Sequence, residues 1–206
     1  STMFKTEIEN FPIYLLLGLI TYNFYKNATN IALASLSNRS SLITQIYFPR
    51  SIPAISSCIT ASIMLLVELS ILGVFMAVLG FTPPITIIYL IPIYILGFVF
   101  VIGLSLGLSV LNVKFKDIEF IWGIILHAGF FLTPIFYRFD FLPQYVQDVL
   151  MLSPVVQLVT MTHHVSLYGS LPSTNSILYT VSSIFIILGI GYLIFRKYQA
   201  RIVEEM

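Results

Sequence analysis

The sequence contains few charged residues and almost no cysteine. Charged side chains make up 9% of the 206 residues, whereas soluble domains usually carry about a quarter. Hydrophobic residues make up 58%, and the mean hydropathy is +0.96. This composition excludes an ordinary soluble domain and indicates an integral membrane protein. The net charge of +1 provides no strong field, so we expect no nucleic-acid partner.

Several kinds of chemistry are also missing. The single cysteine, Cys58, excludes an internal disulfide and a cysteine metal cluster. The chain has no Gly-x-x-x-x-Gly-Lys-Ser/Thr loop and therefore lacks that route to ATP. His163 and His164 are adjacent and would point in different directions on a helix, which makes them a poor metal pair. No Ser-His-Asp set or carboxylate pair has a catalytic context. We therefore expect a non-enzymatic chain that binds no metal and no cofactor.

Five apolar segments are long enough to cross a membrane. A bilayer core of about 30 Å requires about 20 mostly apolar residues per helix. The first segment has a polar second half that contains Lys26, and the second segment contains Glu68. The predicted spans are residues 11–36, 54–79, 84–110, 118–136 and 177–195.

The basic residues predict the orientation of these spans, because lysine and arginine favour the cytoplasmic loops of a membrane protein. Most of them fall in loops on one side of the predicted bundle: Arg39, Arg50, Lys114, Lys116, Arg196, Lys197 and Arg201. This distribution predicts a cytoplasmic C-terminus and an external Ser1. Since no signal peptide precedes the first span, we expect one further helix ahead of Ser1.

Residues 37–50 are too polar to span a membrane, yet their apolar side chains are regularly spaced. Leu42, Ile43, Ile46 and Tyr47 recur at helical spacing, and Pro49 ends the pattern. We expect a short amphipathic helix that lies along the cytoplasmic surface. This helix would either rest on its apolar face or dock a cytoplasmic partner.

Residues 142–168 form two short amphipathic pieces that Ser153-Pro154 divides. Proline removes a backbone donor and ends helices, so Pro134, Pro143 and Pro154 mark breaks in the chain. Broken backbone at membrane depth survives only where it is buried in protein or lines a wet cavity. The pattern predicts a re-entrant external helix pair, closed by Gly169, that acts as a gate or as a static cap.

Two charges and several aromatic residues lie inside the predicted spans. Lys26 and Glu68 are costly at such depth and would pair, contact a substrate or, for Lys26, snorkel to the interface. Tyr22 and Tyr25 belong to an aromatic cluster that would stack on sugars or form an interfacial belt. Tyr22, Tyr25, Lys26 and Glu68 are therefore candidates for a pore, whereas His127 is expected to be structural.

In its motifs the chain resembles the membrane subunit of type 2 ABC exporters, in particular the polysaccharide, O-antigen and teichoic-acid export permeases. The order and spacing of short motifs carry this resemblance over nearly the whole chain. They are Tyr47-Phe48-Pro49-Arg50, Leu111-Asn112-Val113-Lys114-Phe115-Lys116-Asp117-Ile118, Thr133-Pro134-Ile135-Phe136-Tyr137, Leu142-Pro143, Ser153-Pro154 and Phe195-Arg196-Lys197. The chain departs from the family pattern at Lys116, Thr133 and Ser153, where the family usually has arginine, serine and asparagine.

The resemblance implies a homodimer of permeases served by two cytoplasmic ATPase subunits, which hold the ATP and magnesium. It also implies a further N-terminal membrane helix ahead of Phe11 and a prokaryotic cytoplasmic membrane. Residues expected to couple the permease to the ATPase are Leu42, Ile46, Tyr47, Phe48, Pro49 and Arg50. Those of the adjoining cytoplasmic turn are Asn112, Lys114, Lys116 and Asp117. Those of the external gate are Thr133, Pro134, Tyr137, Pro143, Ser153 and Pro154.

The sequence thus predicts an all-α integral membrane protein, one transmembrane permease domain over residues 1–206. It would have five spans, a cytoplasmic coupling helix and an external re-entrant pair. The implied function is ATP-driven export of a polysaccharide or lipid-linked glycan across the cytoplasmic membrane. An ABC exporter of a drug or lipid remains open. A proton-coupled carrier also remains open, although such carriers typically use several buried carboxylates and Glu68 is nearly alone.

Overall fold

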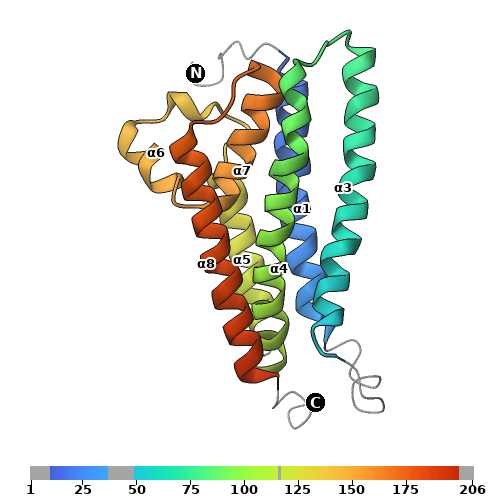
Figure 1. Ribbon diagram of the computed structural model, residues 1–206, viewed down its shortest axis with the longest axis vertical. Coiled ribbons are helices and arrows are strands. Elements are labelled where there is room, and N and C mark those ends of the chain that lie inside the picture. The colour runs from blue at the N-terminus through green and yellow to red at the C-terminus, as the bar shows by residue number, and fades with distance from the viewer. Residues whose placement is uncertain (1–9, 37–48, 116, 200–206) are drawn as a thin grey trace.

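The computed structural model describes residues 10–36, 49–115 and 117–199. Within these ranges the chain is helical and contains no strand, which confirms the predicted all-α fold. Five long helices run roughly along the long axis of the molecule (Figure 1). They are α1 (Phe11–Ser35), α3 (Ile52–Val78), α4 (Leu90–Lys114), α5 (Ile118–Leu132) and α8 (Thr174–Tyr198).

Shorter helices occupy the end of the bundle where α1 and α8 begin, here called the α6–α7 end (Figure 1). The segment η2 (Ile85–Tyr89) leads into α4, and η3 (Phe139–Phe141) precedes the pair. Helices α6 (Gln144–Leu150) and α7 (Pro154–His163) follow, and α7 continues as the π-helical turn η4 (His164–Tyr168). The chain bends by 110° between the two helices of this pair, which confirms the predicted broken helix pair.

Proline and glycine set several helix boundaries. Proline fits the first turn of a helix because that position needs no intrahelical amide donor, and α1, α3 and α7 all begin in this way. Thr133 precedes a proline, which disfavours the helical region for its backbone, and it adopts an extended ψ of 136°. Gly169 ends η4 in the left-handed region at φ 63°, a conformation that favours glycine.

Each predicted span overlaps one long helix, but α4 runs on to Lys114 instead of ending at residue 110, and α5 ends early. This helix ends at Leu132 instead of residue 136 and has 15 residues, a length of about 22 Å that falls short of a bilayer core. Three helical segments of the described chain are long and apolar enough to cross a membrane: Ile52–Val78, Ile85–Lys114 and Thr174–Tyr198. The bent pair would make a fourth if it counts as one broken span. The α1 helix has the length, but its second half is polar.

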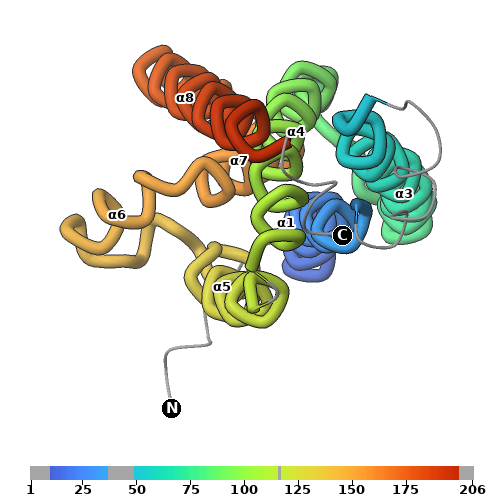
Figure 2. The backbone as a smooth tube through the Cα atoms, turned by 90° about the horizontal axis from the view of Figure 1, so that it is seen from below, coloured from blue at the N-terminus to red at the C-terminus, as the bar shows by residue number. Residues whose placement is uncertain are grey.

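The bundle packs most closely where α4 crosses α8. A Cβ atom added at Gly103 would lie 2.6 Å from the Cα atom of Leu188, and one added at Gly191 would collide with the carbonyl of Gly103. The two backbones can approach so closely only because neither position carries a side chain. On the other side of α4, α1 packs against both α3 and α4, and α3 and α5 lie on different sides of α1 (Figure 2).

The two arms of the bent pair differ in burial. Every residue from Val156 to His163 is buried, because α7 packs against α1, α4 and α8. No residue of α6 is buried. In Figure 2 the α6 segment projects from the bundle, whereas α7 lies against its centre. The pair therefore consists of one anchored arm and one peripheral arm.

Candidate functional site

A polar stripe runs along α1, and two of its residues, Asn23 and Lys26, lie beside α5. Asn23, Lys26, Asn27 and Asn30 recur at spacings of three and four residues, which place them on one side of a helix. Lys26 and Asn30 are exposed, and Asn23 and Asn27 are half-buried. This stripe is the polar second half of the first predicted span.

Two hollows open on the α1–α5 face. The first, here called the lysine hollow, has a volume of about 260 Å³ and is lined by Tyr22, Asn23, Lys26, Leu126, His127, Phe130 and Phe131. The second, here called the tyrosine hollow, has a volume of about 270 Å³. It is lined by Tyr22, Tyr25, Ile125, Gly129, Leu132, Thr133, Val149, Leu150, Ser153, Val155 and Val156.

Tyr22 forms the wall that the two hollows share. Its side chain is 1% exposed, its hydroxyl donates to the carbonyl of Leu126, and its ring centroid lies 5.4 Å from that of Phe130. Tyr25 stacks on Phe100, with centroids 5.7 Å apart, and meets Trp122 edge-on at 6.1 Å. Packing therefore fixes both tyrosines, so the hollows have rigid aromatic walls.

The four predicted pore residues do not form one site. Tyr22, Tyr25 and Lys26 line the two hollows, but Glu68 belongs to α3 and lines neither. Lys26 and Glu68 form no ion pair in the described structure, where the only one joins Arg138 to Asp140. Buried Oε2 of Glu68 has no hydrogen-bond partner. Tyr22, Tyr25 and Lys26 therefore lie on the α1–α5 face, whereas Glu68 lies on α3.

His127 lies at the rim of the lysine hollow. Its Nδ1 atom is 2.7 Å from the carbonyl of Gly123 in the same helix. A carbonyl only accepts, so Nδ1 carries a proton. This hydrogen bond within α5 agrees with the expectation that His127 is structural.

The predicted gate residues fall into three groups. Pro134 and Tyr137 belong to the loop after α5, which Tyr14 of α1 holds in place. The Tyr14 hydroxyl lies 3.1 Å from the carbonyl oxygen of Pro134 and 2.7 Å from that of Tyr137. Thr133 and Ser153 line the tyrosine hollow instead. Pro143 and Pro154 mark the starts of α6 and α7.

His163 fixes α7 to α1 beside the loop after α5. Its ring stacks on Tyr14 with centroids 3.8 Å apart, and its Nε2 atom donates to the Tyr14 carbonyl over 3.0 Å. Gly18 provides the space, since a Cβ atom there would lie only 3.2 Å from Nε2 of His163. Sequence reasoning missed Tyr14 and Gly18, because nothing local to them indicates a partner about 149 residues away.

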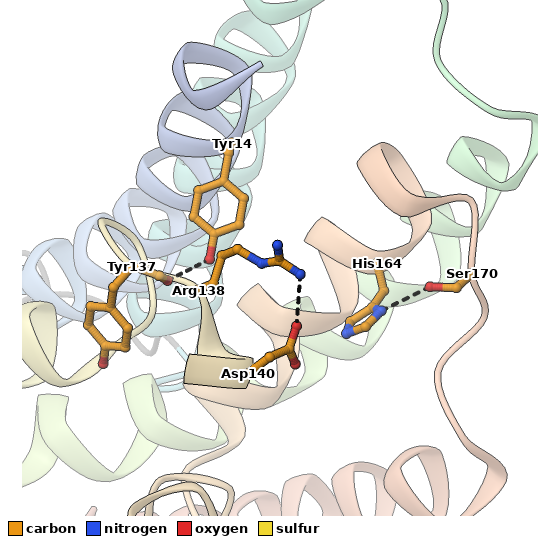
Figure 3. Close-up of polar contacts among 6 residues, drawn as sticks. All are labelled: Tyr14, Tyr137, Arg138, Asp140, His164 and Ser170. Atoms are coloured by element: carbon orange, nitrogen blue, oxygen red, sulfur yellow. Dashed lines mark hydrogen bonds and ion pairs between the residues drawn. The ribbon is translucent and has the colours of Figure 1, made fainter. Parts of the chain in front are cut away.

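A charged cluster lies on the outside of the loop after α5 (Figure 3). Arg138 pairs with Asp140 over 3.3 Å and lies over the rings of Phe141 and Tyr168, at 5.1 Å and 5.5 Å from their centroids. His164 contacts the Ser170 hydroxyl through Nδ1 at 2.9 Å. In the same loop, burial raises the pKa of the Tyr137 phenol, so this group stays neutral in the physiological range.

Gln157 forms hydrogen bonds that connect the break between α6 and α7 to α8. Its amide nitrogen donates to the carbonyl of Met151, and its amide oxygen accepts from the Thr180 hydroxyl. Gln157 and Thr180 are 2% and 0% exposed. A glutamine in an apolar segment was the available signal, but its partners could not be read from the sequence.

The opposite end of the bundle holds the described part of the predicted coupling region. Arg50 donates to the carbonyl of Gln199, and the Asn112 amide donates to that of Leu33 over 2.9 Å. The Lys114 ammonium lies 4.4 Å from the centroid of the Tyr198 ring. Asp117 occupies the N-cap position of α5 without a side-chain cap bond, and Pro49 directly precedes Arg50. Leu42, Ile46, Tyr47, Phe48 and Lys116 lie outside the described residues.

These contacts join the ends of α1, α3, α4 and α8 at one end of the bundle. Arg50 and Asn112 both bond to backbone carbonyls near helix C-termini, which lack intrahelical partners. In residues 10–36, 49–115 and 117–199, no group of three histidine, cysteine or acidic side chains could hold a metal ion.

Comparison with known proteins yields one family and several relatives. Residues 1–167 match the family described as ABC-2 type transporter. The chain is 26% identical over 202 residues to an O-antigen export system permease protein RfbA of Klebsiella pneumoniae, covering 97% of this chain and 77% of that protein. It is 22% identical over 208 residues to the protein of the same name from Myxococcus xanthus, covering 100% and 80%.

These matches agree with the helical bundle, its membrane-length helices and its bent pair. They confirm the resemblance to type 2 ABC exporters and the expectation of a transport subunit. The chain belongs to the ABC-2 type transporter family: it is a multi-pass membrane permease, a transport subunit.

Proposed function

We propose that this permease exports a polysaccharide or lipid-linked glycan, and that the cargo moves along the α1–α5 face. The observation that carries the proposal is the polar stripe of Asn23, Lys26, Asn27 and Asn30 on a helix at membrane depth. Polar and charged groups at such depth face water, a cavity or another protein surface. The name of the relatives, O-antigen export permease, supports a glycan as cargo.

The two hollows have the chemistry that sugars require. Tyr25 and Phe130 are half-buried and present aromatic surface, and Ser153 adds a hydroxyl. Aromatic rings stack on the apolar faces of sugar rings, and scattered polar groups bond to hydroxyls without a deep pocket. A wall of this kind would let a chain of sugars slide.

A second copy of the chain would close this path. Within one protomer α5 buries only Leu126, and it exposes large apolar side chains on the rest of its surface. The polar stripe beside it lies open in a single protomer. A homodimer that places two α1–α5 faces opposite each other would cover the apolar surface of α5 and enclose the polar stripe, as the family resemblance implies.

Energy would come from a cytoplasmic ATP-binding subunit that holds the ATP and magnesium. The end of the bundle with Arg50, Asn112, Lys114 and Lys197 carries the basic residues, so we place it in the cytoplasm, with the C-terminus there. The predicted coupling residues Leu42, Ile46, Tyr47, Phe48, Pro49 and Arg50 adjoin this end in the sequence. Contacts of Arg50 with the end of α8 would pass ATPase movement into the bundle.

The gate would be α6 alone. Helix α7 is fixed by His163 on α1 and by Gln157 on α8. Helix α6 buries no residue, and Val149 and Leu150 at its end form part of the tyrosine hollow. Movement of α6 about the breaks at Pro143 and Ser153 would open this hollow while α7 stays in place.

Two measurements test the proposal together. The full-length protein should co-purify from mild detergent with an ATPase in equal amount, and vesicles containing the complex should release glycan when ATP is added. Replacing Asn23 and Asn30 with leucine should reduce release at least about tenfold without loss of the ATPase. Replacing Thr60 and Ser70 on α3 with leucine serves as the matched control and should leave release unchanged. A stable permease without an ATPase would contradict the export function, and ATP-driven release of a drug or lipid alone would replace the cargo.

A further inference from the structure

A polar pocket, here called the outer pocket, lies at the α6–α7 end of the bundle. It has a volume of about 120 Å³ and is enclosed by the break before α7, by α7 and η4, by the loop after η4 and by the first turn of α8. None of its lining residues also lines the lysine hollow or the tyrosine hollow. The outer pocket is therefore separate from the hollows of the α1–α5 face.

The outer pocket lies at the external boundary of the membrane. Helix α8 has 25 residues and is about 37 Å long, whereas a bilayer core is about 30 Å thick. Arg196 and Lys197 in its last turn mark the cytoplasmic boundary in the proposed orientation. A span of about 20 residues counted back from Arg196 ends at Ser176, which lines the pocket. Leu171 and Ser173 in the adjoining loop are exposed, so the pocket is next to the external solution.

The polar groups of the outer pocket offer both hydrogen-bond donors and acceptors. Gln157 donates through its amide nitrogen to the carbonyl at the break before α7, and this nitrogen keeps a second hydrogen. The Thr160 hydroxyl donates to a carbonyl of its own helix over 2.8 Å, so its oxygen remains an acceptor for a ligand. The Ser173 and Ser176 hydroxyls lie 2.8 Å apart and share one bond, which leaves one hydroxyl hydrogen for a ligand.

The rest of the lining favours an uncharged ligand. No carboxylate, lysine or arginine is among the described residues that line the pocket. His164 adds an imidazole that contacts the Ser170 hydroxyl through Nδ1 (Figure 3). The remaining wall is apolar and consists of Met151, Met161, Leu171 and Pro172. A few fixed polar groups beside apolar surface are typical of a small-molecule site, and they suit a ring with hydroxyls at its edge and C–H groups on its faces.

The volume of the outer pocket matches one sugar ring. A single water needs about 10–15 Å³ of such a volume, so the pocket has room for roughly 8–12 non-hydrogen atoms. This is the size of a single hexose with its hydroxyls, and it is too small for a disaccharide.

We propose that the outer pocket binds one neutral sugar residue of the glycan after the chain has left the α1–α5 face. Sugar hydroxyls accept from Gln157 and the serine pair and donate to Thr160, while the apolar wall contacts a face of the ring. The proposal rests on the proposed export function and adds a second sugar-binding site to it. Val155 and Val156 of α7 line the tyrosine hollow, so the anchored arm borders both sites. A sugar held on this fixed helix would hinder the return of the exported chain.

The test measures sugar binding by the full-length permease in phosphatidylcholine nanodiscs, which avoid detergents with sugar headgroups. Saturation-transfer NMR would use the methyl glycosides of glucose, galactose and mannose as separate probes. We expect at least one of them to bind with a dissociation constant of roughly 1 mM, since a single sugar ring makes few contacts. The glycan collected from the ATP-driven release assay should displace that glycoside.

Two pairs of variants locate the binding. Ser176→Leu places a branched side chain at the pocket and should weaken binding at least about tenfold, whereas Ser182→Leu, on the same helix but outside the pocket, should bind as the parent does. Thr160→Val keeps the shape but removes an acceptor and should weaken binding about fivefold. Its control, Thr162→Val, loses a matching 2.8 Å bond to the α7 backbone outside the pocket and should leave binding unchanged. The threonine pair decides the matter if Ser176→Leu does not fold.

Four results would overturn the assignment. The first is no saturation transfer to any of the glycosides or to the released glycan, which would leave water as the occupant. The second is equal binding by the parent, Ser176→Leu and Thr160→Val, which would place the sugar elsewhere. The third is tighter binding of glucose 1-phosphate than of methyl glucoside, which would make the ligand an anion. The fourth is failure of the released glycan to displace the glycoside, which would make an unrelated sugar the ligand or, where dihexanoyl phosphatidylglycerol displaces it, a lipid headgroup.

Failure of the outer pocket differs from failure of the export function. A parent protein that co-purifies with an ATPase and releases glycan, but binds the glycosides no better than Ser176→Leu does, would remove only the second sugar site. A parent protein without an ATPase and without ATP-driven release would remove the function itself, whatever the pocket binds.

Discussion

The α1–α5 face and the outward face of α3 lie at the same depth of the bundle but differ in chemistry. On α3 the exposed side chains include Ile63, Leu66 and Val74, at 59%, 64% and 66% exposed. The two exposed hydroxyls, of Thr60 and Ser70, donate to carbonyls of their own helix over 2.9 Å and 2.7 Å. Nothing polar on this face needs an external partner, which is what a lipid environment requires.

The α1 helix presents the opposite case. Lys26 and Asn30 are exposed, and the Lys26 side chain has no ion-pair partner in the described structure. His127 on α5 is exposed and lines the same hollow as Lys26. The comparison teaches that exposure alone does not identify a lipid-facing surface; the presence of polar groups without internal partners separates a water-facing surface from one that faces lipid.

A lysine placed on each of the two faces should show the largest difference between them. Leu66→Lys puts a charge on the lipid-facing side of α3 and should cost about 2.5–3.5 kcal/mol of apparent insertion free energy. Asn27→Lys puts the same charge on the polar stripe and should cost less than half as much. An in vitro insertion assay measures both. Equal costs would show that the two faces have the same environment.

The next largest effect should come from the close contact of α4 and α8. Gly191→Ala drives a methyl group into the Gly103 carbonyl and should destabilise the fold by about 1–3 kcal/mol or more. Gly189→Ala, two residues away, meets no atom within 4 Å and faces outward. Thermal unfolding in detergent compares the two. Alanine favours the helix more than glycine does, so Gly189→Ala should not lose stability. A Gly189→Ala protein that unfolds as early as Gly191→Ala would show that the α4–α8 contact does not set the cost.

Local signals predicted much of this fold. Hydropathy placed the long helices, and Pro134, Pro143 and Pro154 placed the breaks around the bent pair. The predicted end of α5 was too late, because the apolar run continues to Phe136 while Thr133 already takes an extended backbone before its proline.

The candidate site was only partly predictable. Tyr22, Tyr25 and Lys26 were identified because polar and aromatic residues in a span are informative by themselves. The separation of Glu68 from Lys26 depends on how α3 packs on α1, and no spacing within either helix encodes it. The Tyr14–His163 contact joins residues about 149 positions apart, so only the assembled bundle shows it.

A smaller effect on stability is expected where Tyr14 of α1 bonds to the loop after α5. Tyr14→Phe removes the hydroxyl that bonds to the Pro134 and Tyr137 carbonyls and should reduce stability by about 1 kcal/mol. Tyr145→Phe removes an exposed hydroxyl from α6 and should change nothing measurable. Unfolding in detergent again provides the readout. A loss of stability in Tyr145→Phe, equal to that in Tyr14→Phe, would argue against α6 as the peripheral arm.

The smallest effect should come from the lipid-facing hydroxyls. Thr60→Val removes a group that bonds only to the carbonyl of Ser56 and should shift stability by less than about 0.5 kcal/mol. Transport should also be unchanged, in contrast to Asn23→Leu on the polar stripe, which should lower it. A transport defect in Thr60→Val would place α3, and not α1, beside the cargo.

The central claim, that the α1–α5 face meets water or cargo and the α3 face meets lipid, has a direct test. Single cysteines at Asn23, Asn30, Ile63 and Leu66 would be treated in intact membranes with a charged, membrane-impermeant thiol reagent; the buried Cys58 of the parent serves as the background. The account predicts rapid labelling at Asn23 and Asn30 and none at Ile63 and Leu66. Labelling of all four positions at similar rates, or of the α3 positions alone, would contradict it.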